Sequence, residues 1–148
     1  MKRRKVKIGR TKVCSAEYGV TQVTTSGGTA HVHRLKPCEQ CPWRKDLPTG
    51  VFPTEAYRTS APTAYDAALT TFACHMSGSA APASCAGFLM RHAANNLACR
   101  ISQASGRLDL SKVTDGGFPL YKTYREMAIA NGVEPNEKVL QLVRGNME

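Results

Sequence analysis

The stretch Lys36-Pro37-Cys38-Glu39-Gln40-Cys41-Pro42-Trp43-Arg44-Lys45 places two cysteines, two prolines and the only tryptophan of the chain within ten positions. A C-x-x-C turn can direct two sulfur atoms at one centre, so the stretch predicts either a metal site or a redox disulfide. The prolines beside the cysteines restrict the backbone and stiffen the turn. The rest of the chain must decide between these chemistries.

The composition is that of an ordinary globular protein, with 42% hydrophobic and 21% charged residues among 148. We expect one domain, residues 1–148, with a core that does not need a metal simply to fold. We find no signal-peptide pattern and no apolar run near the ~20 residues of a membrane helix, so we expect a cytoplasmic protein without membrane contact. In a reducing compartment, paired cysteines favour metal or redox chemistry over structural disulfides.

The net charge of +9 is concentrated in the first third of the chain. Residues 1–45 contain eleven Lys or Arg and two acidic residues, whereas residues 46–148 carry equal numbers of both signs. This asymmetry is expected of an arm or face that meets a polyanion. The residues that we assign to contact with nucleic acid or a partner are Lys2, Arg3, Arg4, Lys5, Lys7, Arg10, Lys12, Arg34, Lys36, Trp43, Arg44 and Lys45.

The residue patterns predict an α+β fold. Alternating and β-branched residues in 5–8, 18–25 and 29–35 indicate a small N-terminal antiparallel hairpin or three-stranded sheet, with a turn at residues 27–28. The proline-rich region 36–84 should consist of loops stapled by a metal, with one short helix after Phe52-Pro53. Three C-terminal helices are expected over 85–105, 120–130 and 135–143. The chain thus divides into a basic β-rich arm (1–35), a metal-binding region with a helix (36–105) and C-terminal helices (106–148).

The candidate metal ligands form two groups that lie far apart in the sequence. A structural zinc site needs four soft or borderline donors, commonly two from one C-x-x-C turn and two from elsewhere. Cys38, Cys41, His75 and Cys85 supply this set, with Cys74 as the alternative to His75. An iron–sulfur cluster is the alternative cofactor, but its motifs concentrate three cysteines in one run. Ligands arriving in pairs therefore favour Zn²⁺.

The sequence favours binding over catalysis without excluding an enzyme. A catalytic zinc keeps one position open, whereas this donor set can close around the ion. The chain has no H-x-E, G-x-S-x-G, Walker or H-E-x-x-H motif. Two binding functions remain: a basic surface for nucleic-acid phosphates, or a protein-recognition patch that contains Trp43, Phe52 and Tyr57. The alternative to both is that Trp43 closes the core over the metal and that the N-terminal charges form a solubilising tail. An iron–sulfur cluster would instead indicate a redox or sensor protein.

The motifs P-C-x-x-C-P-W-R (37–44), F-A-C-H (72–75) and C-A-G-F (85–88) together resemble an uncharacterised family of small phage, prophage and bacterial proteins. The resemblance covers about residues 36–105. It implies an accessory protein, in the host-cell cytoplasm if phage-encoded, and it supports the cysteine and histidine candidates as a unit. The resemblance carries no activity and does not identify the metal or the partner. A basic accessory protein of this type would suit nucleic acid as its target, or a host complex, such as a polymerase or a defence system, that it inhibits or modulates.

Overall fold

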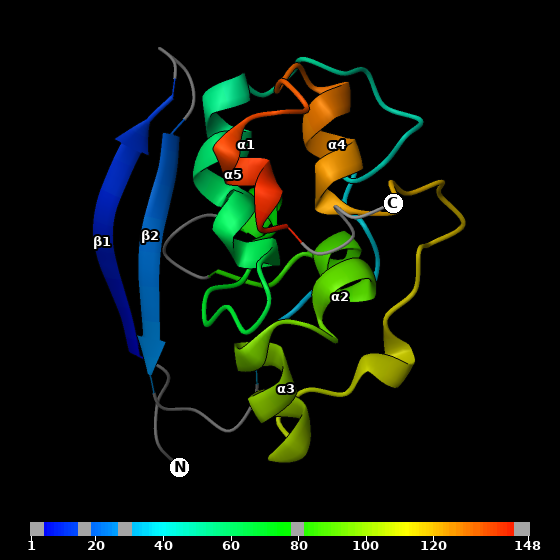
Figure 1. Cartoon of the computed structure of the whole chain (residues 1–148). Coiled ribbons are helices and arrows are strands. Elements are labelled where there is room, and N and C mark those ends of the chain that lie inside the picture. The colour runs from blue at the N-terminus through cyan, green and yellow to red at the C-terminus, as the bar shows by residue number, and fades with distance from the viewer. Residues whose placement is uncertain (1–4, 15–18, 27–30, 78–81, 144–148) are drawn as a thin grey trace.

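The computed structural model describes residues 5–14, 19–26, 31–77 and 82–143 (Figure 1). Its elements are β1 (Lys5–Val13), β2 (Gly19–Ser26), α1 (Thr54–Ser60), α2 (Ala86–His92), α3 (Leu97–Ala104), α4 (Tyr124–Ala130) and α5 (Lys138–Gln141), with 3₁₀ turns at Ala61–Ala64, His75–Ser77 and Leu110–Lys112. A strand pair followed by several helices confirms the α+β class. None of the helices within these ranges is long and apolar enough to cross a membrane.

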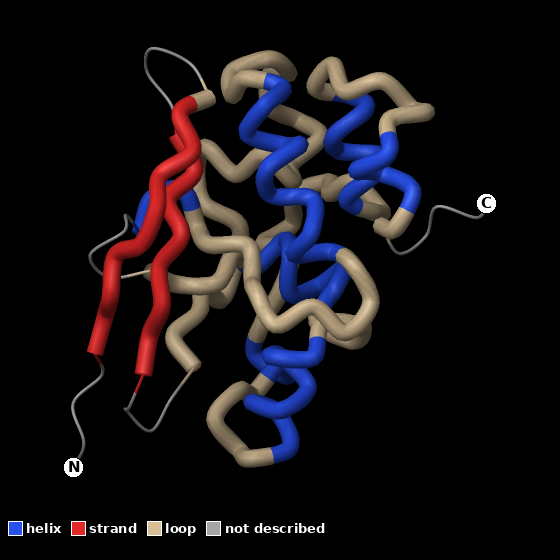
Figure 2. Tube along the Cα trace, turned by 60° about the vertical axis from the view of Figure 1, so that its left-hand side comes forward, coloured by secondary structure: helices blue, strands red, loops and turns tan. Residues whose placement is uncertain are grey.

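The two strands form an antiparallel hairpin along one side of the helical body (Figures 1 and 2). Their pairing runs from Lys5 opposite Ser26 to Val13 opposite Gly19. β2 is the inner strand and packs beside α1. The hairpin therefore presents β1 as its outer edge.

An N-terminal antiparallel strand pair is confirmed, whereas the described part of the expected third segment is not a strand. The connection between β1 and β2 spans residues 14–18, whereas the expected turn at 27–28 lies outside the described residues. Of the expected strand over 29–35, the described part makes only an isolated parallel bridge between His33 and Ser84.

The single helix predicted over 85–105 is two helices, α2 and α3. The break is held by Asn96, whose side chain is completely buried. Its Oδ1 accepts the backbone N–H of Cys99 at 3.0 Å, and its Nδ2 donates to the carbonyls of Thr63 and Thr70 at 3.2 and 2.8 Å. Asn96 therefore caps α3 and ties it to a distant loop, and these bonds would be lost if the helix ran through.

The helices α4 and α5 are shorter than predicted, whereas α1 forms where a short helix was expected. α4 begins at Tyr124 rather than near residue 120, because the Thr123 hydroxyl accepts the Glu126 backbone N–H at 3.1 Å and caps the helix there. α5 covers only four residues of the expected 135–143. The short helix expected after Phe52-Pro53 is α1, with Pro53 as its extended N-cap.

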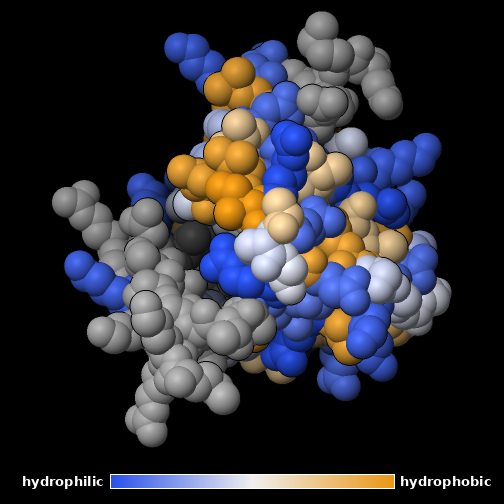
Figure 3. Space-filling view, turned by 90° about the horizontal axis from the view of Figure 1, so that it is seen from below, coloured by the Kyte–Doolittle hydropathy of each residue, from blue (hydrophilic) through white to orange (hydrophobic). Residues whose placement is uncertain are grey.

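Trp43 lies in the core rather than on the surface. Its side chain is 0% exposed, and its ring contacts those of Phe72, His92 and Tyr124 at centroid distances of 6.0, 5.7 and 5.8 Å. Around this cluster the helices bury their apolar faces. Seen from below, the surface shows hydrophobic patches separated by hydrophilic residues (Figure 3). The core thus connects the cysteine turn directly to α2 and α4.

Candidate functional site

The C-x-x-C stretch folds as two consecutive turns. The backbone N–H of Cys41 donates to the carbonyl of Cys38 at 3.3 Å, and that of Arg44 donates to the carbonyl of Cys41 at 3.1 Å. The Arg44 guanidinium also reaches the Cys38 carbonyl, at 3.3 Å. These bonds close the turn around the two sulfur atoms.

Cys74 and Cys85 lie on two paired segments, one on each side of a backbone bridge. Ala73 and Ser84 form an antiparallel bridge. On either side of it, Cys74 donates its N–H to Ala83 at 2.6 Å, and Cys85 donates to Phe72 at 2.8 Å. This local pairing brings together residues that are eleven positions apart in the sequence.

The four thiols form one chain of pairwise contacts, in the order Cys74, Cys38, Cys41 and Cys85. Cys38 contacts the side chains of Cys41 and Cys74, and Cys41 contacts Cys85 with a sulfur–sulfur distance of 3.7 Å. Within the described ranges, no group of three or more His, Cys, Asp or Glu side chains is placed so that it could hold a metal ion. The cysteines are thus adjacent but not yet arranged around one point.

One sulfur–sulfur distance in the cluster is compatible with two ligands of a tetrahedral ion. A Zn–S bond of about 2.3 Å places neighbouring sulfurs of a ZnS₄ site about 3.8 Å apart, close to the distance between Cys41 and Cys85. A disulfide would instead require sulfurs about 2.05 Å apart. Thiolates that ligate different irons of a cluster stand further apart than sulfurs in contact. In this arrangement Cys41 and Cys85 are therefore two separate thiols, at a spacing that two ligands of one ion could also have.

Without a cation, Cys38 and Cys41 are held in the neutral thiol form, because the pKa of each is raised. The pKa of Cys38 is raised, first by its hydrogen bond with Cys41 and then by burial. The hydrogen bond with Cys38 lowers the pKa of Cys41, but the contact with Cys85 and burial outweigh it and raise the pKa to about 12. A divalent cation bound by these thiols would lower their pKa values, because it stabilises thiolates. Its binding would therefore release protons from the cysteines.

The structure distinguishes between the two adjacent ligand candidates. The Cys74 thiol is buried against Cys38, whereas the His75 side chain is exposed and packs edge-on against Phe52 at 4.8 Å. Cys74 therefore replaces His75 in the ligand set that we carry forward.

Cys14 and Cys99 do not join the thiol chain. Cys14 contacts the Lys12 carbonyl in the hairpin. Cys99 is fully buried in α3, where burial raises its pKa to about 11 and keeps it a neutral core thiol.

Two residues assigned to surface contacts have structural roles instead. Trp43 is enclosed by the core, so its indole is not available to a nucleic acid or a partner. Arg44 makes a bidentate ion pair with Asp46 at 2.9 and 2.7 Å, and its guanidinium lies 3.6 Å over the ring of Phe118. We therefore remove Trp43 and Arg44 from the proposed contact surface.

The other basic candidates divide into described and undescribed groups. Lys7 and Lys12 are exposed on β1, and Arg34, Lys36 and Lys45 are exposed on the body. Lys45 pairs with Glu126 at 3.6 Å. The remaining candidates are Lys5 and Arg10, whose backbones lie in β1, and Lys2, Arg3 and Arg4, which lie outside the described residues.

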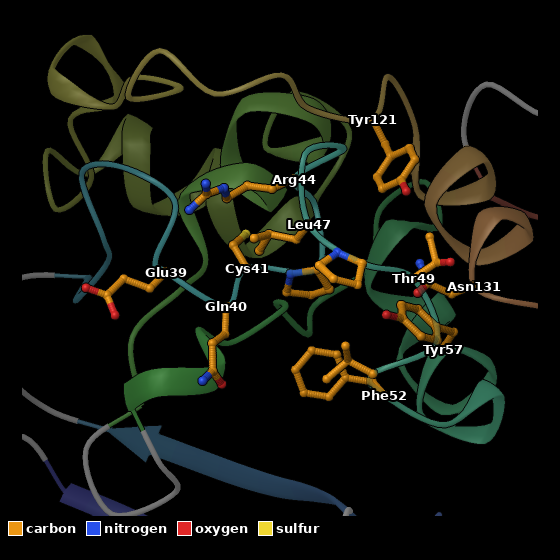
Figure 4. Close-up of a pocket in the computed structure, with 13 residues that line it drawn as sticks. Glu39, Gln40, Cys41, Arg44, Leu47, Thr49, Phe52, Tyr57, Tyr121 and Asn131 are labelled. Carbon is orange, nitrogen blue, oxygen red and sulfur yellow. The ribbon is translucent and has the colours of Figure 1, made fainter.

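A cavity of about 260 Å³ lies beside the cysteine turn (Figure 4). Cys41 lines it from one side, while Tyr57 from α1 and Tyr121 from the segment before α4 line the other. Burial raises the pKa of Tyr57, with further contributions from the nearby Tyr121 and Cys41. Sequence reasoning had placed Phe52 and Tyr57, which line this cavity, in a recognition patch. It missed Tyr121, because no motif marks that residue.

The comparisons with known proteins identify a family but no characterised relative. No curated protein and no solved structure matches the chain. The sequence model of a family of unknown function, DUF6283, matches residues 33–144, which include all four cysteines of the cluster and the cavity. The β1–β2 hairpin precedes this region. The chain belongs to the DUF6283 family of unknown function.

Proposed function

We propose that this chain is a zinc-stabilised nucleic-acid-binding protein of the phage accessory type. A structural zinc held by Cys38, Cys41, Cys74 and Cys85 fixes the loop-rich region, and the basic hairpin contacts phosphates. The observation that carries the proposal is the hairpin itself, which exposes Lys7 and Lys12 on its outer strand.

The charges of the hairpin support a polyanionic partner. β1 contains Lys5, Lys7, Arg10 and Lys12, and β2 contains no acidic residue that could neutralise them. Within the described part of the chain, no ion pair involves Lys7 or Lys12. Their charges therefore remain available to phosphates, which bind Lys and Arg irrespective of base sequence.

The zinc has a structural role in this proposal. Four cysteine ligands would close the coordination sphere, so no position remains for a reacting water. Binding worth about 10–16 kcal/mol would hold together segments that few regular elements connect. All six cysteines are free thiols, which suits a reducing compartment such as the cytoplasm of a host cell.

The test is a titration of labelled duplex DNA and single-stranded RNA followed by fluorescence anisotropy at several salt concentrations. The intact protein should bind both, with an affinity that falls steeply with salt. Replacing Lys7 and Lys12 together by Gln should make the log–log slope on duplex DNA shallower by about 2, since each phosphate contact contributes about 0.9.

A matched control removes two charges from the body. Lys122 and Lys138 are exposed near α4 and α5, away from the hairpin strands in sequence. The Lys122→Gln/Lys138→Gln variant should keep the slope of the original protein. Equal losses in both variants would show a response to net charge alone, and no binding at low salt would refute the proposal.

A further inference from the structure

A β-bulge in β1 decides which residues of the hairpin share a face. The register shifts between Ile8 and Thr11, where β1 advances by three residues while β2 advances by two. Successive residues of a regular strand lie on opposite faces, so Lys7 and Lys12, at an odd spacing, would be separated. The extra residue of the bulge corrects this, because the positions opposite the two lysines on β2 are 24 and 20, at an even spacing. Lys7 and Lys12 therefore share one face.

The bulge thereby gives the hairpin a basic face and an apolar face. The basic face holds Lys5, Lys7 and Lys12, opposite positions 26, 24 and 20 of β2, none of which is charged. The apolar face holds Ile8 and Val13, which are 56% and 73% exposed. Since Lys7 and Lys12 are exposed as well, β1 is open to solvent on both faces along the side of the body (Figure 2). A groove of suitable width can therefore take up the hairpin by its basic face.

The hairpin lacks the side chains with which proteins bind single-stranded nucleic acids. Such proteins stack successive bases on aromatic rings beside a basic groove. Neither β1 (KVKIGRTKV) nor β2 (GVTQVTTS) contains an aromatic residue, and Trp43 is enclosed by the core. The hairpin can neutralise phosphates but cannot stack on bases. This combination favours a duplex, in which the bases already stack on one another.

The dimensions of the hairpin fit one groove of one kind of duplex. Paired strands lie about 4.8 Å apart, and the major groove of B-form DNA, about 12 Å wide, admits a two-stranded β-ribbon. The minor groove is only about 6 Å wide, and the major groove of A-form RNA is too narrow for side chains to read. From Lys5 to Lys12 the basic face runs along positions 26 to 20 of β2, which is about 20 Å at 3.4 Å per residue.

We propose that the basic face of the hairpin docks along the major groove of duplex DNA, with the β1 lysines beside the phosphates of one DNA strand. All three lysines of this face come from β1, so β1 lies at the groove wall and the uncharged β2 lies toward the base edges. The inference rests on the proposed nucleic-acid binding, and it specifies the ligand and the groove.

The first experiment compares three ligands of one sequence by fluorescence anisotropy at one salt concentration: duplex DNA, duplex RNA and single-stranded DNA. The full-length, zinc-loaded protein should bind duplex DNA at least tenfold more tightly than either of the others. Equal affinity for all three would overturn docking in the major groove but leave the proposed nucleic-acid binding in place. No binding of any ligand at low salt would refute both.

The second experiment locates the groove on the DNA. Dimethyl sulfate methylates guanine N7, which lies in the major groove, and adenine N3, which lies in the minor groove. On a short duplex saturated with the protein, guanine N7 should be protected and adenine N3 should remain reactive. Protection of adenine N3 with guanine N7 left reactive, or protection of neither, would overturn the proposal.

Two variants test whether the face of a lysine matters. The exchange Thr11→Lys/Lys12→Thr keeps the net charge but moves one lysine from the basic to the apolar face. Its affinity for duplex DNA should fall about two- to tenfold, and its log–log salt slope should become shallower by about 0.9. Ile8→Lys is the matched control, because it adds a charge on the apolar face, and it should keep the slope of the original protein.

The opposite results for these variants would show that only net charge counts. They are an unchanged slope in the exchange variant, or a slope steeper by about 0.9 in Ile8→Lys. Circular dichroism and urea denaturation check that both variants keep the fold. The comparison of ligands and the methylation experiment use the original protein, so they test the proposal even where a variant unfolds.

Discussion

Gly87 occupies a helical position where alanine would ordinarily be preferred. An added Cβ would lie 2.6 Å from the Cβ and 2.8 Å from the Cγ of Trp43. These atoms are close to the Trp43 backbone, so side-chain rotation cannot relieve the clash. Gly87, in the C-A-G-F motif, therefore leaves the space against which Trp43, in the P-C-x-x-C-P-W-R motif, packs.

We predict that Gly87→Ala destabilises the protein by about 1–3 kcal/mol, the usual cost of overpacking. The measurement is the free energy of unfolding from urea denaturation. Helix propensity alone would give the opposite sign, a stabilisation of roughly 0.5–1 kcal/mol. A more stable Ala variant would thus contradict the packing of α2 on Trp43.

His92 gives the fold a dependence on pH. Its Nε2 accepts the Tyr124 backbone N–H at 3.0 Å, and its Nδ1 lies 3.2 Å from the Asn95 Oδ1, which fixes a neutral ring with the proton on Nδ1. Burial lowers the pKa of His92 below its ordinary 6.5. The unfolded chain therefore takes up this proton more readily, so the contribution is complete above pH 6.5 and is lost as the pH falls through the lower folded value.

We predict that the unfolding free energy of His92→Gln falls less between pH 7.5 and 5.5 than that of the original protein. The cysteines are present in both proteins, so the comparison of slopes isolates the histidine. His33→Gln, at a half-buried position outside the core, is the control and should keep the original slope. Equal slopes for all three proteins would show that His92 is not held neutral by the fold.

At the scale of the element, Asn96 decides where α3 begins. We predict that Asn96→Ala costs about 2–4 kcal/mol, because it removes the cap and leaves two carbonyls without their donor. Thr123→Ala removes only the cap of α4 and should cost about 0.5–2 kcal/mol. Urea denaturation of both variants measures the difference, and equal costs would mean that the link to the 63–70 loop contributes nothing.

The same residue shows why some elements could be predicted and others could not. The strand pattern and the proline before α1 are local signals, and both elements formed close to the expected positions. A similarly clear local pattern predicts one continuous helix over 85–105. It consists of apolar residues at steps of four: Leu89, Ala93, Leu97 and Ile101. The helix is interrupted because the Asn96 amide bonds to residues 63 and 70, which no local window contains.

In the candidate site, too, local sequence signals could be predicted and contacts between distant residues could not. The C-x-x-C spacing and the second cysteine pair predicted which segments would meet. The choice of Cys74 over His75 depends on the pairing of Ala73 with Ser84, and the burial of Trp43 depends on Gly87 in another helix. Both contacts belong to the tertiary structure. The sequence therefore left the choice between Cys74 and His75 open, and it assigned Trp43 to a contact surface with a core position as the alternative.

At the scale of the whole molecule, the zinc should act on one region more than on the others. We predict that removing it with a chelator raises amide hydrogen exchange in residues 36–85 well before the core of α4. The reason is that the turn and the paired segments around the cysteines hold few regular hydrogen bonds of their own. If the chelator raised amide hydrogen exchange equally throughout the chain, or raised it nowhere, a zinc that stabilises residues 36–85 in particular would be contradicted.

The most direct test of the central claim is the metal content of the purified chain and of its single Cys→Ser variants, by native mass spectrometry and elemental analysis. The account predicts one zinc per chain, retained when Cys14, Cys99 or His75 is replaced. It predicts that the zinc is lost or greatly weakened when Cys38, Cys41, Cys74 or Cys85 is replaced. A folded, metal-free original protein, or full zinc content in the Cys74→Ser variant together with its loss in a His75→Ala variant, would contradict it.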